Sequence, residues 1–132
     1  MQKPVLYLVI PCYNEQEVLP VTSKLFLNQI NDLIEKDLIN KDSKILFVND
    51  GSKDKTWDII SQLSANNDAF KGISLSRNRG HQNALLAGLM YAKDRCDITI
   101  SIDCDGQDDI TATEQMVPRI CFLSSFVPFC SI

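Results

Sequence analysis

Four carboxylates fall within seven residues of the chain, from Asp103 to Asp109. They follow a β-like run at 97–102, and only one residue separates Asp103 from Asp105. At a strand end where the chain turns, two such carboxylates can face one point. Hard oxygen ligands suit Mg²⁺ or Mn²⁺, which keep several waters and take further ligands from a substrate's phosphates. Gln107 could add an oxygen. The stretch predicts a divalent-metal site, with a solvated acidic loop as the alternative interpretation.

Other sites built on this pattern fit less well. An EF-hand loop starting at Asp103 would place Glu114 at position twelve, but Asp108 stands at position six, where glycine is needed. A phosphatase-type D-x-D usually follows the first strand of its fold, whereas this one follows the fourth β-like run. A dinucleotide-binding fold requires G-x-G-x-x-G after the first strand, and residues 11–15 contain no glycine.

Further candidate residues follow the first two β-like runs. Asp50 is either a turn former or the acceptor of a ring N–H from a nucleobase, and its position at a strand end favours the second role. Tyr13 is either a half-buried core aromatic or a platform on which a base stacks. Asn14 and Glu17 are predicted to cap the following helix, which leaves Glu15 free to meet a ligand.

The third β-like run is followed by Arg77, Arg79 and His81. The two arginines either hold a diphosphate or are solvated turn residues. His81 is the only histidine of the chain, and a helix-start residue is the more frequent role for such a side chain than a catalyst.

The elements that must position these residues alternate along the chain. Apolar runs predict strands over 5–10, 44–49, 72–76 and 97–102, and the first, which Pro11 ends, has the unbroken apolar character of a strand buried on both faces. Helical spacing predicts helices over about 18–34, from Asp54 onward, over about 81–93, and over a short stretch within 111–117. This order predicts one α/β domain with a parallel sheet. Ligands of such sheets bind beyond the carboxyl ends of the strands, so the polar clusters should converge on one edge.

Composition narrows the class of protein. The chain has 132 residues, of which 45% are hydrophobic and 23% charged, and its net charge of −4 argues against a broad nucleic-acid-binding surface. Five cysteines without a C-x-x-C pair indicate neither a disulfide framework nor a zinc site, which favours a reducing, cytoplasmic compartment. Cys104 is predicted to be a small buried residue that faces away from its two aspartate neighbours. Neither a signal peptide nor an apolar run of roughly 18 residues is evident.

Four ordered segments together resemble a known family. The segments are 9–15, 48–54, 76–84 and 101–105, and they closely resemble family 2 glycosyltransferases of the GT-A fold. Within that family the chain is most similar to dolichol-phosphate mannose synthases and bactoprenol glucosyltransferases. The resemblance covers about residues 4–117. It implies a Rossmann-like, mostly parallel sheet flanked by helices that forms the nucleotide-sugar-binding half of an inverting transferase.

The resemblance also implies a role for each site position. It implies a UDP- or GDP-sugar donor, Mg²⁺ or Mn²⁺, and a polyprenyl phosphate or cell-envelope saccharide as the acceptor. The nucleoside positions are Pro11, Tyr13 and Glu15, and the base position is Asp50. The metal positions are Asp103, which also meets the ribose, Asp105, which also meets the diphosphate, and Gln107, which assists the metal in some members.

The end of the chain departs from the family pattern. Family members continue with the acceptor site, a catalytic base and often membrane helices, whereas residues 120–132 are uncharged and hold three phenylalanines. We therefore divide the chain into a nucleotide-sugar-binding portion, 1–117, and an atypical apolar tail, 118–132, which truncation or a frameshift would explain. The tail could cover a sheet edge, join a second copy, or be disordered.

Two hypotheses follow for function. The chain is either a transferase, associated in its full-length form with the cytoplasmic face of a membrane, or a non-catalytic nucleotide-binding fragment. No residue of the sequence can be named as the catalytic base.

Overall fold

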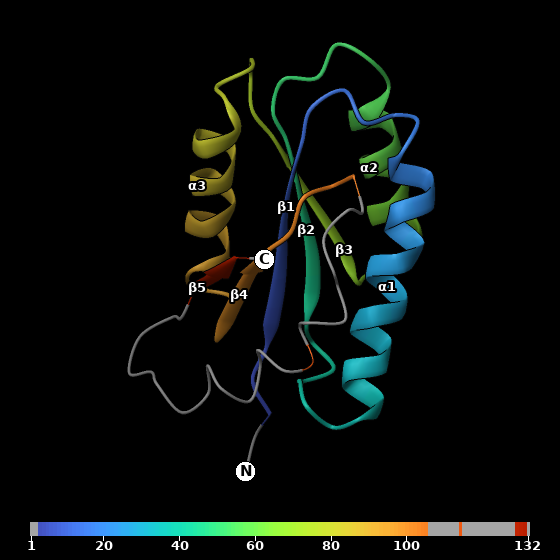
Figure 1. The fold of residues 1–132 in the computed structure, drawn as a ribbon, viewed down its shortest axis with the longest axis vertical. Helices are drawn as coiled ribbons and strands as arrows, with labels where there is room; N and C mark the ends of the chain where they lie inside the picture. Colours follow the sequence, from blue (N-terminus) through green and yellow to red (C-terminus); the bar gives the residue numbers. More distant parts are fainter. Residues whose placement is uncertain (1–2, 106–113, 115–128, 132) are drawn as a thin grey trace.

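Strand β1 lies at the centre of a five-stranded sheet whose order is β3-β2-β1-β4-β5 (Figure 1). The computed structural model describes residues 3–105, 114 and 129–131. All four strand pairings are parallel. In chain order, the elements are β1 (Leu6–Cys12), α1 (Leu19–Glu35), β2 (Lys44–Asn49), α2 (Thr56–Asn66), β3 (Phe70–Ser74), α3 (His81–Ala92), β4 (Ile98–Ser101) and β5 (Phe129–Ser131).

Helices cover both faces of this sheet, with α1 and α2 on one side and α3 on the other (Figure 1). Alternate residues of β1 serve the two layers: Leu8 and Ile10 belong to the core cluster that includes α1 and α2, whereas Val9 packs with residues of α3. Every residue of β1 is buried. The predicted α/β fold, with a first strand buried on both faces, is therefore confirmed.

Strand β1 extends beyond the point where the sequence predicted its end. Pro11 was expected to terminate the strand, but Pro11 and Cys12 both pair with β2. The carbonyl of Cys12 accepts the N–H of Asp50, so the backbone of Cys12 faces β2. The backbone nitrogen of the preceding residue, Pro11, therefore faces the other side, toward β4, as the backbone of Val9 does. The pairing of β1 with β4 ends at Val9 and Ser101. The missing N–H of proline therefore costs no bond to β2.

The predicted capping of α1 by Asn14 and Glu17 is wrong. The N-cap of α1 is Val18, and no side chain caps it. Asn14 has a positive φ of 53°, and its Oδ1 accepts the backbone N–H of Lys53 instead. The side chain is thus used to hold the loop after β2. Pro20 lies in the first turn of α1, where a proline removes no intrahelical hydrogen bond.

Other boundaries shift by a few residues. Strand β3 begins and ends two residues earlier than expected, and β4 is shorter at both ends. Asp54 does support the start of α2, because its Oδ1 accepts the N–H of Thr56 at 2.9 Å, although the N-cap residue itself is Lys55. The short helix expected within 111–117 lies outside the described residues, apart from Glu114.

Part of the apolar tail lies at the edge of the sheet. Strand β5 pairs with β4 in parallel, with Ile100 opposite Cys130. This placement agrees with the first of the three arrangements predicted for the tail, in which it covers a sheet edge. In the part of the chain that the structure describes, no helix combines the length and apolar character needed to cross a bilayer.

Two close backbone approaches set the positions of the loops around the site. Gly88 of α3 has no room for a side chain, because a Cβ there would lie 2.5 Å from Cγ1 of Val9 and 2.8 Å from Cγ2 of Val48. Gly51, after β2, adopts a φ of +64°, and a Cβ there would lie 2.2 Å from the backbone nitrogen of Asn78. The first approach brings α3 onto the sheet, and the second brings the β2 turn against the loop after β3.

We predict that Gly51→Ala disrupts this loop contact. The backbone nitrogen of Asn78 cannot yield as a flexible side chain would, and positive φ is also unfavourable for alanine. We expect a loss of about 1–3 kcal/mol in the free energy of unfolding, measured by urea denaturation. Gly80→Ala is the matched control, because Gly80 also has positive φ but open space around the added Cβ. Equal losses in the two variants would contradict the role of the contact.

We also predict that Gly88→Ala destabilises the protein by about 1–3 kcal/mol, because the added methyl group overpacks the interface between α3 and the sheet. The intrinsic preference of alanine for helices works in the opposite direction, by about 1 kcal/mol. Thermal and urea unfolding would measure the balance, with the exposed helix position Gln82→Ala as the control. A stabilised Gly88→Ala protein would show that α3 can move away from the sheet without cost.

Candidate functional site

A cavity of about 260 Å³ opens at the carboxyl edge of the sheet. Four chain segments line it, and each of them follows a strand. The lining residues are Pro11, Cys12, Tyr13 and Glu15 after or at the end of β1, Asp50 after β2, Asn78, Gly80 and His81 after β3, and Asp103, Cys104 and Asp105 after β4. The predicted convergence of the polar clusters on one edge of the sheet is thus confirmed.

Asp50 is the most buried of the acidic residues in this cavity, with 3% of its surface exposed. Its Oδ1 accepts the backbone N–H of Arg79 at 2.7 Å, and its own N–H donates to the carbonyl of Cys12 at 2.8 Å. Asp50 therefore joins the ends of β1 and β2 to the loop after β3. A turn-forming role and a ligand-facing role are both compatible with this position, since the residue also lines the cavity.

The loops after β1 and β2 are connected by hydrogen bonds that involve side chains. The N–H of Asn14 donates to Oγ of Ser52, the N–H of Glu15 donates to Oγ1 of Thr56 at 2.8 Å, and the N–H of Lys55 donates to Oε1 of Gln16. These bonds give partners to backbone N–H groups that lie outside the hydrogen-bond pattern of the sheet. They fix the loop that brings two side chains to the cavity, namely Tyr13, which is 40% exposed, and Glu15.

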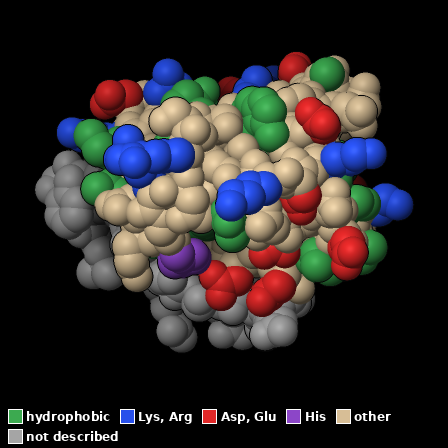
Figure 2. Space-filling model, turned by 90° about the horizontal axis from the view of Figure 1, so that it is seen from above, with side chains coloured by type: hydrophobic (Ala, Val, Ile, Leu, Met, Phe, Trp, Pro, Cys, Tyr) green, Lys and Arg blue, Asp and Glu red, His purple; other side chains and the backbone are tan. Residues whose placement is uncertain are grey.

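Negative charge accumulates in this cavity around Glu15. The pKa of Glu15 is raised above its ordinary value, chiefly by burial and then by the negative charges of Asp105, Asp54 and Asp103. Figure 2, which looks onto this edge of the sheet, shows acidic side chains gathered beside the histidine. A cation bound between Asp103 and Asp105 would reduce this repulsion.

The described side chains of this region supply only part of the oxygen ligands that a divalent cation such as Mg²⁺ needs. Among the residues that the structure describes, no three His, Cys, Asp or Glu side chains are arranged to hold a metal. Asp103 and Asp105 supply two carboxylates. Such a pair suits Mg²⁺ or Mn²⁺, which bind through one or two carboxylates together with a substrate's phosphates. Gln107, the third predicted ligand, lies outside the described residues.

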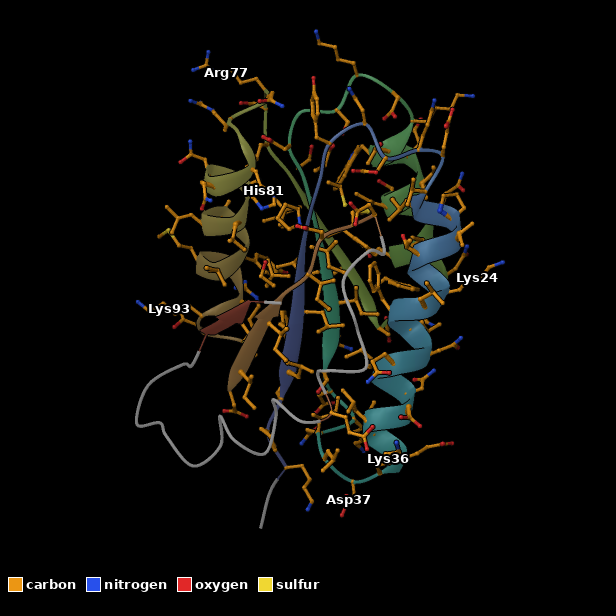
Figure 3. The ribbon with its side chains drawn as sticks, viewed as in Figure 1. Lys24, Lys36, Asp37, Arg77, His81 and Lys93 are labelled. Atoms are coloured by element: carbon orange, nitrogen blue, oxygen red, sulfur yellow. The ribbon has the colours of Figure 1, made fainter. Side chains whose placement is uncertain are left out.

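His81 and the two arginines differ in their placement. His81 is the first residue of α3, as predicted, and it lines the cavity with Asp103 and Asp105. Figure 3 shows Arg77 extending away from the body of the molecule, whereas His81 lies beside the sheet. Neither arginine side chain lines the cavity, and Arg79 contributes its backbone N–H instead.

The floor of the cavity contains two thiols. Cys104 is 3% exposed and Cys12 is 1% exposed, and both belong to the hydrophobic core on the side of α1 and α2. The pKa of the Cys12 thiol is raised well above its ordinary value by burial and then by its hydrogen bond with Cys104. The prediction that Cys104 is buried is confirmed, whereas both of its aspartate neighbours are exposed. All three residues nevertheless line the same cavity, so the expectation that Cys104 faces away from the aspartates stays a prediction.

Sequence reasoning gave no site role to four lining residues, Cys12, Asn78, Gly80 and Cys104. Their polar or small side chains lie next to the predicted residues along the chain, so the available signal was their position at the carboxyl ends of β1, β3 and β4. The positive φ of Gly80, at the N-cap of α3, has no sequence signal beyond the glycine itself.

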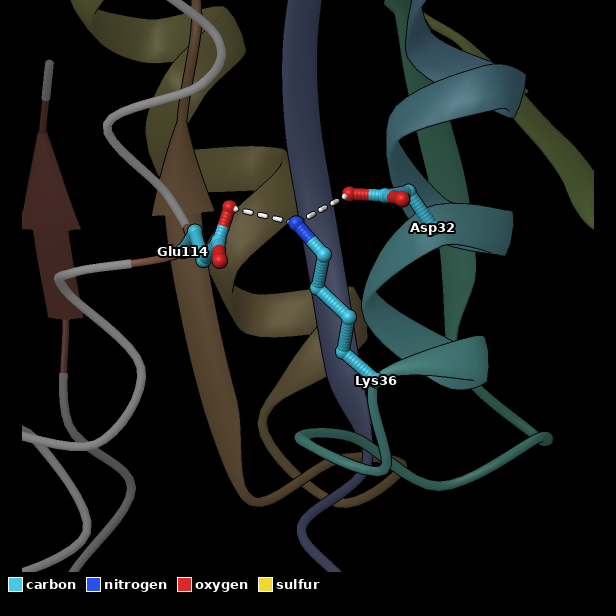
Figure 4. Close-up of polar contacts among 3 residues, drawn as sticks. All are labelled: Asp32, Lys36 and Glu114. Carbon is cyan, nitrogen blue, oxygen red and sulfur yellow. Dashed lines mark hydrogen bonds and ion pairs between the residues drawn. The ribbon is translucent and has the colours of Figure 1, made fainter.

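Beyond the cavity, an ion-pair network connects α1 to the chain after the acidic stretch. Nζ of Lys36 lies 3.1 Å from Oδ2 of Asp32 and 3.0 Å from Oε2 of Glu114 (Figure 4). The pKa of Lys36 is raised, first by the hydrogen bond to Glu114 and then by that to Asp32. The network lies on the surface and adds a contact between residues 78 positions apart in the sequence.

Known proteins resemble this chain in sequence and in structure. Residues 7–128 match the family model described as glycosyl transferase family 2. The chain is 55% identical over 109 residues to the uncharacterized glycosyltransferase YkoT of Bacillus subtilis (strain 168), covering 83% of this chain and 32% of that protein. It is 35% identical over 112 residues to the prophage bactoprenol glucosyl transferase homolog of Escherichia coli (strain K12), covering 85% and 34% of the two chains. The chain thus spans about a third of the length of these relatives.

A solved structure agrees at the level of the fold. The crystal structure of S. aureus TarS 1-349 matches with a TM-score of 0.62 and 18% sequence identity, over 89% of this chain and 32% of that one. Both the sequence match and the topology therefore agree with the resemblance found in the four motifs. The chain belongs to glycosyl transferase family 2 and has the Rossmann-like α/β architecture of the GT-A fold.

Proposed function

We propose that this chain is the donor-binding half of an inverting glycosyltransferase that uses a UDP- or GDP-linked sugar. One observation carries the proposal: a single cavity contains Asp50, Tyr13 and the pair Asp103 and Asp105. These groups suit the parts of such a donor, since a buried carboxylate can accept from a base, an exposed aromatic ring can stack on it, and paired carboxylates can hold a cation beside a diphosphate.

We assign the parts of the donor to different lining residues of the cavity. Pro11, Tyr13 and Glu15 form the wall for the nucleoside, and Asp50 accepts from the base. Asp103 and Asp105 hold Mg²⁺ or Mn²⁺ beside the ribose and diphosphate, with Gln107 as a further candidate. The chemistry that such a cation supplies is neutralisation of the charge that develops on the leaving diphosphate.

The nature of the acceptor decides whether a general base is needed. A hydroxyl of a saccharide must lose its proton as it attacks the sugar, and that step requires a base. A polyprenyl phosphate carries an anionic oxygen at neutral pH, because the second pKa of a phosphate monoester is about 6. The bactoprenol glucosyl transferases among the relatives support a lipid phosphate. With this acceptor, transfer proceeds without an assigned base, at the cytoplasmic face of a membrane.

A second candidate is a nucleotide-binding portion that transfers nothing. It is supported by the lining of the cavity, whose residues suit a nucleotide although none of them is assigned as a catalytic base. Under this alternative the cavity binds a nucleotide, and residues 118–132, including β5, provide an edge or a contact with a second copy.

We predict that UDP or GDP binds only in the presence of Mn²⁺ or Mg²⁺ and that Asp105→Ala abolishes this binding. The reason is that the diphosphate needs a cation between itself and the carboxylates. Isothermal titration calorimetry would measure the binding. Asp68→Ala is the control, because Asp68 is exposed and lies outside the cavity. Absence of binding to the unmodified protein with metal present would contradict the donor-binding role.

Sugar transfer separates the two candidates. We expect the chain to transfer labelled sugar from a nucleotide-sugar to undecaprenyl phosphate in detergent, with thin-layer chromatography of the lipid product as the measurement. Product formation that Asp105→Ala eliminates would exclude the non-catalytic alternative. Metal-dependent nucleotide binding with no product from any nucleotide-sugar would favour that alternative.

A further inference from the structure

We propose that the outer face of α3 is a contact surface for an anionic lipid bilayer. This face consists of Leu86 and Met90, with Arg77 and Arg79 before the helix and Lys93 after it. The inference goes beyond the proposed function, because these residues lie outside the cavity and their contact with lipid requires neither a nucleotide nor a metal.

Two large apolar side chains of α3 are exposed to solvent. Leu86 is 54% exposed and Met90 is 66% exposed, and their spacing of four residues places them on the same face of the helix. The opposite face packs on the sheet through Ala84 and Gly88. Residues 81–92 contain no Asp, Glu, Lys or Arg, so no charged side chain of the helix interrupts the outer face.

Basic residues lie at both ends of this uncharged helix. Arg77 and Arg79 precede it, Lys93 and Arg95 follow it, and all four are exposed. Between the first and the last of these residues, Asp94 is the only acidic one. Figure 3 shows Arg77 and Lys93 extending away from the sheet near the two ends of α3. A chain with a net charge of −4 therefore carries a local excess of positive charge around its exposed apolar pair.

Helix α1 carries a second exposed apolar pair, but the charges around it have the opposite sign. Val21 is 64% exposed and Leu25 is 48% exposed, again four residues apart. Glu17 precedes this pair and Asp32 follows it, with Lys24 as the one basic residue between them. The two helices lie on opposite faces of the sheet (Figure 1). Apolar exposure thus does not distinguish the two faces of the molecule, whereas charge does.

An anionic bilayer matches both properties of the outer face of α3. Its negative headgroups attract basic side chains, and its interfacial region accepts exposed apolar groups. The helix also begins at the cavity, since its first residue, His81, is one of the lining residues. A bilayer that lies along α3 therefore places the cavity next to the surface at which lipid phosphates are found.

The experiment measures cosedimentation of the full chain with vesicles that contain phosphatidylglycerol and phosphatidylcholine in equal parts, and with vesicles of phosphatidylcholine alone. Neither nucleotide nor metal is added. We expect the anionic vesicles to bind at least about tenfold more tightly than the neutral ones, because each basic residue near the membrane surface favours binding. Binding should weaken as sodium chloride is added, because salt screens this attraction.

Substitution of the apolar pair tests whether α3 makes the contact. We expect Leu86→Ser combined with Met90→Ser to weaken binding to the anionic vesicles by about tenfold, because the side chains that enter the interfacial region are lost. Val21→Ser combined with Leu25→Ser makes a similar change on α1 and should leave vesicle binding unchanged. All four positions are exposed, and thermal unfolding would confirm that both variants are folded.

Substitution of the basic residues tests the role of charge. We expect Arg77→Gln combined with Lys93→Gln to weaken binding to the anionic vesicles by about tenfold and to reduce its dependence on salt. Lys24→Gln combined with Lys41→Gln removes the same charge at exposed positions outside α3 and should have a much smaller effect.

Three results would overturn the inference. The first is equal binding to neutral and anionic vesicles, or binding to neither, and this measurement depends on no variant. The second is an equal loss of binding when the apolar pairs of α1 and α3 are substituted. The third is self-association of the chain that the α3 substitutions abolish while vesicles stay unbound, which would assign this face to a second copy. Failure of nucleotide binding, by contrast, would remove the proposed function and leave the vesicle result unchanged.

Discussion

The parallel pairing of β1 with both β2 and β4 is the constraint on which the candidate site depends. Because the strands run in the same direction, their carboxyl ends meet at one edge, and the loops that follow them must lie side by side. Segments more than 90 residues apart, such as those containing Tyr13 and Asp105, thereby line one cavity. The two core layers on either side of β1 hold this arrangement, and α3 packs so closely on the sheet that Gly88 has no room for a Cβ.

The loops at this edge are held mainly by hydrogen bonds between side chains and the backbone. Asn14 accepts the backbone N–H of Lys53, Asp54 that of Gln16 and Asp50 that of Arg79, so each of the three bonds joins two different loops. Short polar side chains are suited to this task, since they can replace the ladder bonds that end with the strands. The consequence is a cavity wall whose position depends on a few side chains, whereas the sheet below depends on the burial of many apolar ones.

The sequence allowed the fold and the location of the site to be predicted, because both follow from periodic signals. Apolar runs marked the strands, and polar clusters at their ends marked the edge where Asp50, Asp103 and Asp105 meet. Local choices between competing polar partners could not be predicted in this way. Asn14 was expected to cap α1, but its positive φ directs its side chain to Lys53, and that partner becomes available only when the sheet brings two loops together. Pro11 was expected to end β1, but the strand continues through it. A strand tolerates a proline whose nitrogen does not face a paired neighbour, and which neighbour it faces depends on the register of β1 with β2 and β4, which the sequence does not show.

The same distinction applies to Asp50, whose role depends both on its position in the sequence and on the contacts that the fold creates. From sequence it is an acidic residue before a glycine at the end of a strand, and either a turn or a ligand explains it. In the structure, one carboxylate oxygen holds the loop after β3 and the residue also lines the cavity, so a turn-holding role and a ligand-facing role are compatible in one side chain. A carboxylate held in this way is preorganised, since its orientation is fixed before a ligand arrives.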